Sequence, residues 1–244
     1  MKVFVVNLER DRERLEDVRR QLDAAGVAFE RFPAVDGAAL SAEELRRVHR
    51  PFLWRCHVGA PARAGEIGCA LTHHGLWRRL VEEKLPAACV LEDDIILRAD
   101  LKDILSRLEG VLRPDEPEVY LLTNYTAAPD DGPFAVRETD QNRSTEAYVL
   151  TREAAKRLLK VNAPLTAPCD HWRRFAFLGG VRIRQVVPTA VKIHEARFGS
   201  YTFPEGTPRI SLRALGLFRW LRHKTLRALG LFLDRGWEIW TRSF

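Results

Sequence analysis

The sequence predicts an α/β fold, a mixed or largely parallel sheet flanked by helices. The chain opens with a strand, a helix and a second strand at the spacing of a βαβ unit, over residues 2–8, 9–22 and 28–35. The apolar run at 87–91 is bounded by polar residues, which is typical of a strand buried on both faces. With 244 residues, the chain is long enough for one large domain, or for one domain with an appendage.

Periodicity, caps and chain breakers predict the later elements. We expect helices from Ser41, over 65–84, 101–111 and 152–161, and from near Asp170. We expect strands at 119–122, 144–150, 181–187 and 190–193. Residues 50–64, with two prolines and a glycine, and the polar stretch 123–142 are expected to be loops. His73 and His74 point about 100° apart on a helix, so we expect one to be buried and the other solvated.

Composition and cysteine usage fit a globular protein. Hydrophobic residues make up 46% of the chain and charged residues 30%. No run approaches the ~18 apolar residues of a membrane span, and the N-terminus lacks the pattern of a signal peptide, so we expect a cytoplasmic protein. The cysteines contain no C-x-x-C pair, which signals neither a zinc knuckle nor a disulfide framework. They are Cys56, Cys69, Cys89 and Cys169.

Three consecutive carboxylates, Glu92, Asp93 and Asp94, follow the strand at 87–91. The negative charges of three adjacent carboxylates repel one another strongly unless a positive charge lies between them. Carboxylate oxygens are also the ligands that hard divalent cations prefer. The alternative is a helix N-terminus, where Asp is favoured. Because ligands bind at the carboxyl ends of strands in α/β sheets, we expect Asn7 and Asp36 to lie at the same edge as these acids.

Several stretches resemble glycosyltransferase family 25, the lipooligosaccharide sugar transferases related to the collagen galactosyltransferases. In the family's order, they are residues 6–10 with Arg14, 32–37, 65–73, 90–94, and 147–150 with the region of Asp170. Together they cover roughly residues 2–175, and their order makes the resemblance specific. Two departures exist: Thr72 stands where serine is usual, and Glu-Asp-Asp is a variant of the D-x-D motif.

The resemblance implies a GT-A type nucleotide-diphospho-sugar transferase fold and a UDP-sugar donor, often UDP-galactose. It also implies a divalent cation, manganese or alternatively magnesium, and an inverting transfer to a glycolipid or oligosaccharide acceptor such as lipooligosaccharide. Asp94, Glu92 and His194 are the expected metal ligands, although a satisfied surface histidine is the alternative for His194. The expected donor-binding residues are Asn7, Leu8, Arg10, Arg14, Val35, Asp36, Gly65, His73, Glu92 and Asp93.

Two assignments within this scheme have alternatives. Arg10 and Arg14 are spaced i, i+4 and would share one helical face toward a phosphate, or would form a solvated surface. An inverting transfer needs a base for the acceptor hydroxyl. Asp170 is the first candidate and Glu66 the second, while the alternative for Asp170 is a simple N-cap.

Two other function classes share the carboxylates: a non-catalytic glycan- or lipid-binding member of the same fold, and a metal-dependent phosphohydrolase.

The tail at 209–244 carries the whole net charge of +6, with eight basic residues against Asp234 and Glu238. The body at 1–208 is therefore neutral, and no nucleic-acid partner is expected. Residues 212–218 recur at 226–232, a period close to four helical turns. The basic, imperfectly amphipathic pattern predicts a helical anchor on anionic lipid, at the inner face of the cytoplasmic membrane. The alternative is a helix packed on the body.

Overall fold

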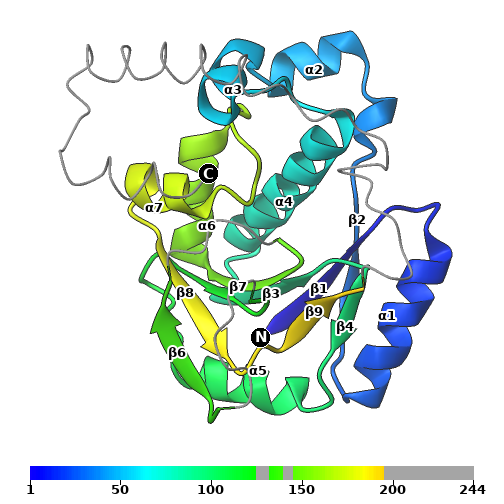
Figure 1. Ribbon diagram of the computed structural model, residues 1–244, viewed down its shortest axis with the longest axis vertical. Coiled ribbons are helices and arrows are strands. Elements are labelled where there is room, and N and C mark those ends of the chain that lie inside the picture. The colour runs from blue at the N-terminus through cyan, green and yellow to red at the C-terminus, as the bar shows by residue number, and fades with distance from the viewer. Residues whose placement is uncertain (125–131, 140–144, 195–244) are drawn as a thin grey trace.

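The computed structural model describes residues 1–124, 132–139 and 145–194 (Figure 1). In this part of the chain, a seven-stranded sheet has the order β2-β1-β3-β7-β5-β8-β6, and β4 and β9 form a separate pair. The strands are β1 (Lys2–Asn7), β2 (Glu30–Pro33), β3 (Ala87–Leu91), β4 (Ile95–Leu97), β5 (Glu118–Leu121), β6 (Ala135–Glu138), β7 (Ala147–Thr151), β8 (Arg182–Val187) and β9 (Val191–Ile193).

The sheet is mixed, because β7 runs antiparallel to both of its neighbours, β3 and β5. On one side of β7, strands β2, β1 and β3 are parallel. On the other side β5 and β8 are parallel, and β6 closes the edge in the antiparallel sense. The opening βαβ unit and the mixed sheet flanked by helices are therefore confirmed, while the second half of the sheet is less parallel than the opening unit suggested.

Helices cover both faces of the sheet (Figure 1). One buried core joins the sheet to α4, α6 and α7, and a second core joins its other face to α1 and α5. All five residues of β3 are buried, as expected for a central strand between the two cores. The helices are α1 (Arg12–Ala24), the 3-10 turn η1 (Gly37–Ala39), α2 (Ala42–Val48), α3 (Pro51–Val58), α4 (Ala64–Glu82), α5 (Leu101–Glu109), α6 (Arg152–Asn162) and α7 (Trp172–Gly179).

Two stretches expected to be loops contain regular elements. Residues 51–58 form α3, in which Pro51 takes the first helical position and Gly59, at φ 85°, ends the helix in the left-handed region. The chain breakers thus act as caps, since proline is tolerated at a helix start and glycine at a helix end. Within the polar stretch after Leu122, strand β6 pairs with β8.

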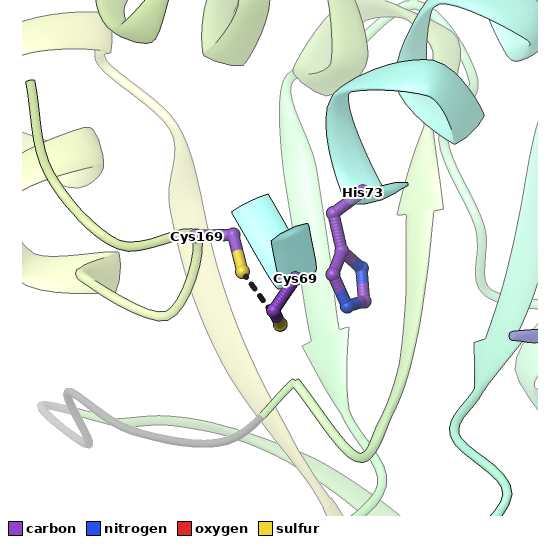
Figure 2. Close-up of side chains that lie close together, drawn as sticks. All are labelled: Cys69, His73 and Cys169. Atoms are coloured by element: carbon purple, nitrogen blue, oxygen red, sulfur yellow. Dashed lines mark hydrogen bonds between the residues drawn. The ribbon is translucent and has the colours of Figure 1, made fainter. Parts of the chain in front are cut away.

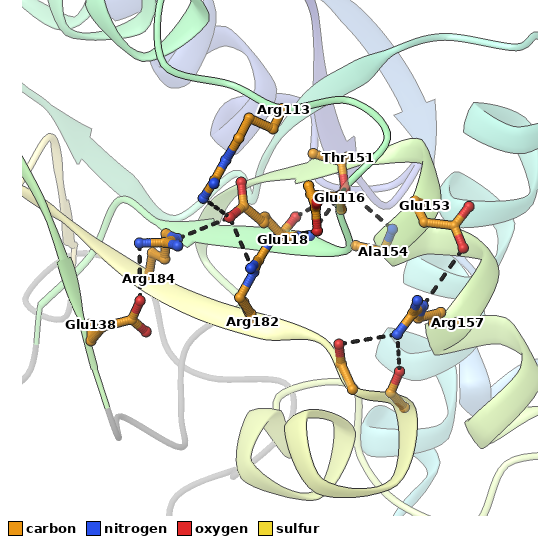
Figure 3. Close-up of polar contacts among 12 residues, drawn as sticks. Arg113, Glu116, Glu118, Glu138, Thr151, Glu153, Ala154, Arg157, Arg182 and Arg184 are labelled. Atoms are coloured by element: carbon orange, nitrogen blue, oxygen red, sulfur yellow. Dashed lines mark hydrogen bonds and ion pairs between the residues drawn. The ribbon is translucent and has the colours of Figure 1, made fainter.

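Local capping signals are confirmed. Ser41 and Glu44 form a reciprocal capping box at α2, as their spacing predicts. The Thr151 hydroxyl accepts a hydrogen bond from the Ala154 N–H at 3.2 Å and caps α6. Figure 3 shows this cap beside a network of charged side chains at the amino ends of β5 and β8.

Glu118 is the centre of that network (Figure 3). Its buried carboxylate lies 2.6 Å from a guanidinium nitrogen of Arg113 and 3.1 Å from one of Arg184, and it also accepts a hydrogen bond from the Tyr120 hydroxyl. Burial raises the pKa of Glu118, but the hydrogen bond from Tyr120 and the two cations outweigh burial and hold this pKa below its usual value. The network therefore stabilises the fold at neutral pH, and this contribution is lost as the pH falls through the lowered pKa.

The turn η1 lies directly against the first turns of α4. A Cβ atom on Gly68 would lie 2.5 Å from the Val35 carbonyl oxygen and 2.7 Å from the Gly37 nitrogen. Glycine at position 68 thus allows the close approach of two backbones, and this approach fixes the segment that carries Asp36.

Replacing Gly68 by alanine should lower the free energy of unfolding by roughly 1–2 kcal/mol. Overpacking against backbone costs about 1–3 kcal/mol, and the better helix propensity of alanine returns up to about 1 kcal/mol. Gly75→Ala in the same helix is the control, because its Cβ would meet only the ring edge of Phe32, at 3.1 Å. Urea denaturation of both variants makes the comparison, and equal midpoints would refute the close-approach account.

Candidate functional site

Polar side chains from four strands meet at one edge of the sheet. Asn7 ends β1, Asp36 follows β2 and Glu92 follows β3. These strands are parallel neighbours, so the prediction that Asn7, Asp36 and the acidic triplet share an edge is confirmed. The antiparallel β7 begins at the same edge and adds Glu146, whose carbonyl oxygen accepts a 2.8 Å hydrogen bond from the Glu92 N–H.

Asp93 is the most enclosed acid of the triplet, with a side chain 11% exposed. Its carboxylate accepts a 2.6 Å hydrogen bond from Asn7 Nδ2 and lies 3.3 Å from a guanidinium nitrogen of Arg14. Burial raises the pKa of Asp93 to about 6, even though the hydrogen bond from Asn7 opposes the shift. The acid is therefore held in place but remains costly to ionise.

Asp94 lies at the start of the small sheet. Its backbone carbonyl accepts a 2.8 Å hydrogen bond from the His194 N–H, so the pairing of β4 with β9 brings His194 to the acidic triplet. One carboxylate oxygen, Oδ2, lies 3.3 Å from Arg14. The other, Oδ1, is buried and has no hydrogen-bond partner within the described residues. Burial raises the pKa of Asp94, and Arg14 only partly offsets this increase.

Glu92 and Glu146 complete a cluster of four carboxylates. Burial, followed by the charges of Asp94 and Glu146, raises the pKa of Glu92 well above its usual value. Glu146 was not singled out from the sequence, although it lies within the strand predicted at 144–150. Only the register that pairs Leu91 with Ala147 places the two glutamates opposite each other.

The oxygen atoms of this cluster are suitable ligands for a hard divalent cation. The charges of Glu92, Asp94 and Glu146 act on one another, and Arg14 lies 3.3 Å from both Asp93 and Asp94. Asp94 Oδ1 is a buried oxygen with no hydrogen-bond partner in the part of the chain that the structure describes. Carboxylate oxygens are the preferred ligands of Mg²⁺ and of chemically similar cations. The alternative reading of the triplet as a helix N-terminus is wrong: residues 93–94 form a bend, and strand β4 follows at Ile95.

The two arginines predicted to share a helical face do not do so. Helix α1 begins at Arg12, so Arg10 lies in the preceding turn, where it forms an exposed ion pair with Asp36. The hydrogen bond from Arg10, together with one from the Ala38 N–H, lowers the pKa of Asp36. Arg14 is instead buried, with a side chain 9% exposed, between Asp93 and Asp94.

Asn7 has a positioning role in the structure. Its amide donates to Asp93 and to the Asp11 carbonyl, and its oxygen accepts from Arg31 Nε at 3.0 Å. Arg31 was not singled out from the sequence, because only strand pairing brings it to β1. Contact between Asn7 and a sugar-nucleotide donor stays a prediction.

The other residues expected to bind the sugar-nucleotide donor are Leu8, Val35 and Gly65, and they lie beside the segments that carry Asn7 and Asp36. The Leu8 carbonyl accepts from the Asp11 N–H at 3.0 Å, and the Val35 N–H donates to Thr72 Oγ1 at 2.9 Å. Thr72 therefore supplies, at the position where serine was expected, a hydroxyl that ties α4 to the turn before Asp36. Gly65 lies in the first turn of α4. The donor contacts of Leu8, Val35 and Gly65 also stay predictions.

Both histidines of α4 are buried, so the expectation that one is solvated is wrong. His73 Nδ1 lies 2.7 Å from the Tyr148 hydroxyl, and Nε2 lies 3.3 Å from Glu92 Oε1. Burial lowers the pKa of His74 to about 4. The His73 side chain is fully enclosed and contacts Glu92, and its contact with the sugar-nucleotide donor stays a prediction.

The two base candidates lie on segments that meet. Glu66 Oε2 accepts from the Arg63 N–H at 2.7 Å and closes the capping box of α4, while burial raises its pKa. Asp170 lies in the turn before α7, whose N-cap position is His171 rather than Asp170. The adjacent Cys169 Sγ lies 3.5 Å from Cys69 Sγ on α4 (Figure 2), so the turn with Asp170 rests against the helix that carries Glu66.

Comparisons with known proteins identify the family. The family model described as "Glycosyltransferase family 25 (LPS biosynthesis protein)" matches residues 1–172. A "Glycosyltransferase 25 family member" of Drosophila melanogaster is 41% identical over 173 residues, which are 70% of this chain and 23% of that protein. "Procollagen galactosyltransferase 2" of Homo sapiens is 26% identical over 66% of this chain and 27% of its own length.

A solved glycosyltransferase involved in glycosylation of the major capsid of PBCV-1 aligns with 64% of this chain and 61% of its own, at a TM-score of 0.32 and 11% identity. This likeness is too low to support an inference. The chain spans about a quarter of the length of the curated relatives above. The family match nonetheless covers well over half of the chain. The matched residues include Glu92, Asp93, Asp94 and Glu146, which together form the carboxylate edge of the sheet. The chain therefore belongs to glycosyltransferase family 25.

Proposed function

We propose that this chain is a metal-assisted, inverting glycosyltransferase. It would move a hexose, galactose being the first to test, from a UDP-sugar to lipooligosaccharide or another surface glycan. The observation that carries the proposal is the cluster of Glu92, Asp93, Asp94 and Glu146 at one edge of the sheet. Arg14 contacts Asp93 and Asp94, and Asp94 Oδ1 has no hydrogen-bond partner within the described residues. Family membership supports the reaction class.

A divalent cation, manganese or magnesium, would be held by Asp94 and Glu92 with His194 beside them, and it would neutralise the charge that develops on the leaving diphosphate. Asp93 is fixed by Asn7 and Arg14 and would orient its neighbours in the cluster. Arg10 and Asp36, paired and partly exposed at the rim, would bind the polar groups of the nucleotide.

In this proposal, Asp170 removes the proton of the acceptor hydroxyl. Asp170→Asn should then lower kcat by about 10²–10⁴-fold, the usual contribution of a positioned base, while the KM for the donor changes little. Glu66→Gln is the matched variant: its amide oxygen can still accept from the Arg63 N–H, so the α4 cap is retained. Steady-state kinetics of both variants over a pH series tests the assignment, and a larger loss of kcat in Glu66→Gln would reverse it.

Incubation with a panel of UDP-sugars, Mn²⁺ and glycan acceptors tests the function itself. Acceptor-dependent release of UDP with formation of a glycosidic bond is the expected result. Binding of UDP-sugar without turnover would favour the non-catalytic glycan- or lipid-binding alternative. Release of phosphate from simple phosphate esters, with UDP-sugars left intact, would favour the phosphohydrolase.

The predicted tail, residues 209–244, lies outside the described residues, and so does the boundary at 208. No helix in the described ranges has the length and apolar character needed to cross a bilayer. We propose that the tail holds the enzyme on anionic lipid at the inner face of the cytoplasmic membrane, because it carries the entire net positive charge.

Truncation after residue 208 should abolish co-sedimentation with vesicles that contain anionic lipid. Binding of the full chain should weaken with salt, since each basic residue near the surface contributes about 1 kcal/mol of screened attraction. Transfer to a water-soluble acceptor is the control and should be unchanged. Equal sedimentation of the truncated and full chains would reject the anchor and favour a tail packed on the body.

A further inference from the structure

The side chains of two cysteines and a histidine lie close together (Figure 2), and the histidine, His73, lies 3.3 Å from Glu92. Cys69 and His73 lie one turn apart on α4, and Cys169 lies in the turn before α7. Ligand atoms of the three side chains all lie within 4.8 Å of one another. Scattered cysteines gave no sign of such a site in the sequence, because the fold brings together residues 100 positions apart.

From this geometry, we propose that Cys69, His73 and Cys169 form a binding site for a thiophilic divalent cation, zinc in the first instance, which is distinct from the hard-cation site at Asp94. The inference rests on the sulfur and nitrogen atoms alone and does not depend on the proposed transferase activity.

The separation of the atoms suits tetrahedral zinc better than a disulfide. With zinc–sulfur bonds of about 2.3 Å, two thiolates of a tetrahedral site lie about 3.8 Å apart. The two sulfur atoms are separated by 3.5 Å, close to that edge and far from the S–S bond length of about 2.05 Å. Small side-chain shifts would therefore place a zinc ion between them.

His73 has the hydrogen-bonded ring nitrogen that is typical of a metal-ligating histidine. Nδ1 lies 2.7 Å from the Tyr148 hydroxyl, which also accepts a 3.0 Å hydrogen bond from Trp77 Nε1. A fixed partner on one ring nitrogen orients the ring and leaves the other nitrogen for the metal. Nε2 is then the ligating atom, so its 3.3 Å contact with Glu92 Oε1 would give way to the metal, and a water molecule would fill the fourth position.

Such an ion would cross-link α4 to the turn that carries Asp170. Soft thiolates select zinc over magnesium and manganese, whereas the carboxylates at Asp94 have the opposite preference. The two sites can therefore be loaded separately.

Cobalt(II) added to anaerobic, fully reduced protein reports directly on thiolate ligation. The full chain should bind one equivalent with a thiolate-to-cobalt charge-transfer band, displaced by zinc, and Asp94→Ala should keep this band. Cys69→Ser and Cys169→Ser should weaken zinc binding, measured against a chromophoric chelator, by more than about 100-fold, beyond the loss that an outer-shell change causes. Cys56→Ser is the control, since Cys56 lies in α3 outside the cluster.

The wild-type spectrum decides the outcome even if a cysteine variant does not fold. Absence of the charge-transfer band in the folded wild-type chain would overturn the proposal. So would zinc affinity that is equal in Cys56→Ser and in folded Cys169→Ser, or loss of the band in Asp94→Ala.

Discussion

Asp94→Ala should abolish sugar transfer, with a loss of at least about 10³-fold, while the protein stays folded. A cation that neutralises a leaving diphosphate contributes several kcal/mol in the transition state, and about 4 kcal/mol corresponds to a factor of 10³. Asp94 combines partial burial with an oxygen that accepts no hydrogen bond from the described residues, which is why it is the first choice as a direct ligand.

The fold should tolerate this substitution because Asp94 is costly when ionised. Its pKa is raised in the folded state, chiefly by burial, so ionisation destabilises the fold increasingly as the pH rises above the ordinary value for aspartate. Alanine removes that cost, and the metal-free variant should be at least as stable as wild type at pH 7. Asp100→Ala, at a half-exposed position paired with Arg98, is the control for transfer. Transfer near the wild-type rate in Asp94→Ala with Mn²⁺ would contradict the assignment.

Arg14→Met should lower the free energy of unfolding of the metal-free protein by roughly 3 kcal/mol, the low end of the cost of breaking a buried ion pair. Arg14 lies 3.3 Å from both Asp93 and Asp94, and methionine keeps the bulk of its stem. Protonation of a carboxylate limits the cost, since burial has already raised the pKa of Asp93 to about 6.

A divalent cation should restore much of this lost stability, because it replaces the missing positive charge and binds only the folded state. The loss should be small near pH 5, where the carboxylates take up protons, and should grow as the pH rises above about 6. Arg20→Met is the matched control: Arg20 is an exposed residue of the same helix, paired with Asp17. Equal losses in the two variants, or no rescue by Mn²⁺, would show that Arg14 does not neutralise the cluster.

The parts of this site that the sequence predicts are those with local signals. The acidic triplet follows an apolar strand directly, Asp36 stands in a turn after the second strand, and the Ser41 and Thr151 caps depend on neighbouring residues. Strand, turn and cap chemistry act over a few positions, so one sequence suffices to place them.

The parts that the sequence does not predict come from long-range pairing. Glu146 reaches Glu92 through the register of an antiparallel strand inserted between parallel ones, a feature with no local sign. Arg31 reaches Asn7, and Cys169 reaches Cys69, in the same non-local way. The error for Arg10 has a local cause, because the helix predicted at 9–22 begins three residues before the true start of α1 at Arg12.

Titration of Mn²⁺ into the full chain with UDP, at pH 5 and pH 7, tests the central claim that the carboxylate edge is a cation-dependent nucleotide site. We predict one Mn²⁺ site that is strengthened by UDP and is tighter at pH 7, because the raised pKa values of Asp93, Asp94 and Glu92 mean that protons must leave before the cation binds. We also predict that this site is lost in Asp94→Ala. Manganese affinity that is the same in wild type and Asp94→Ala, and independent of pH and UDP, would contradict the account.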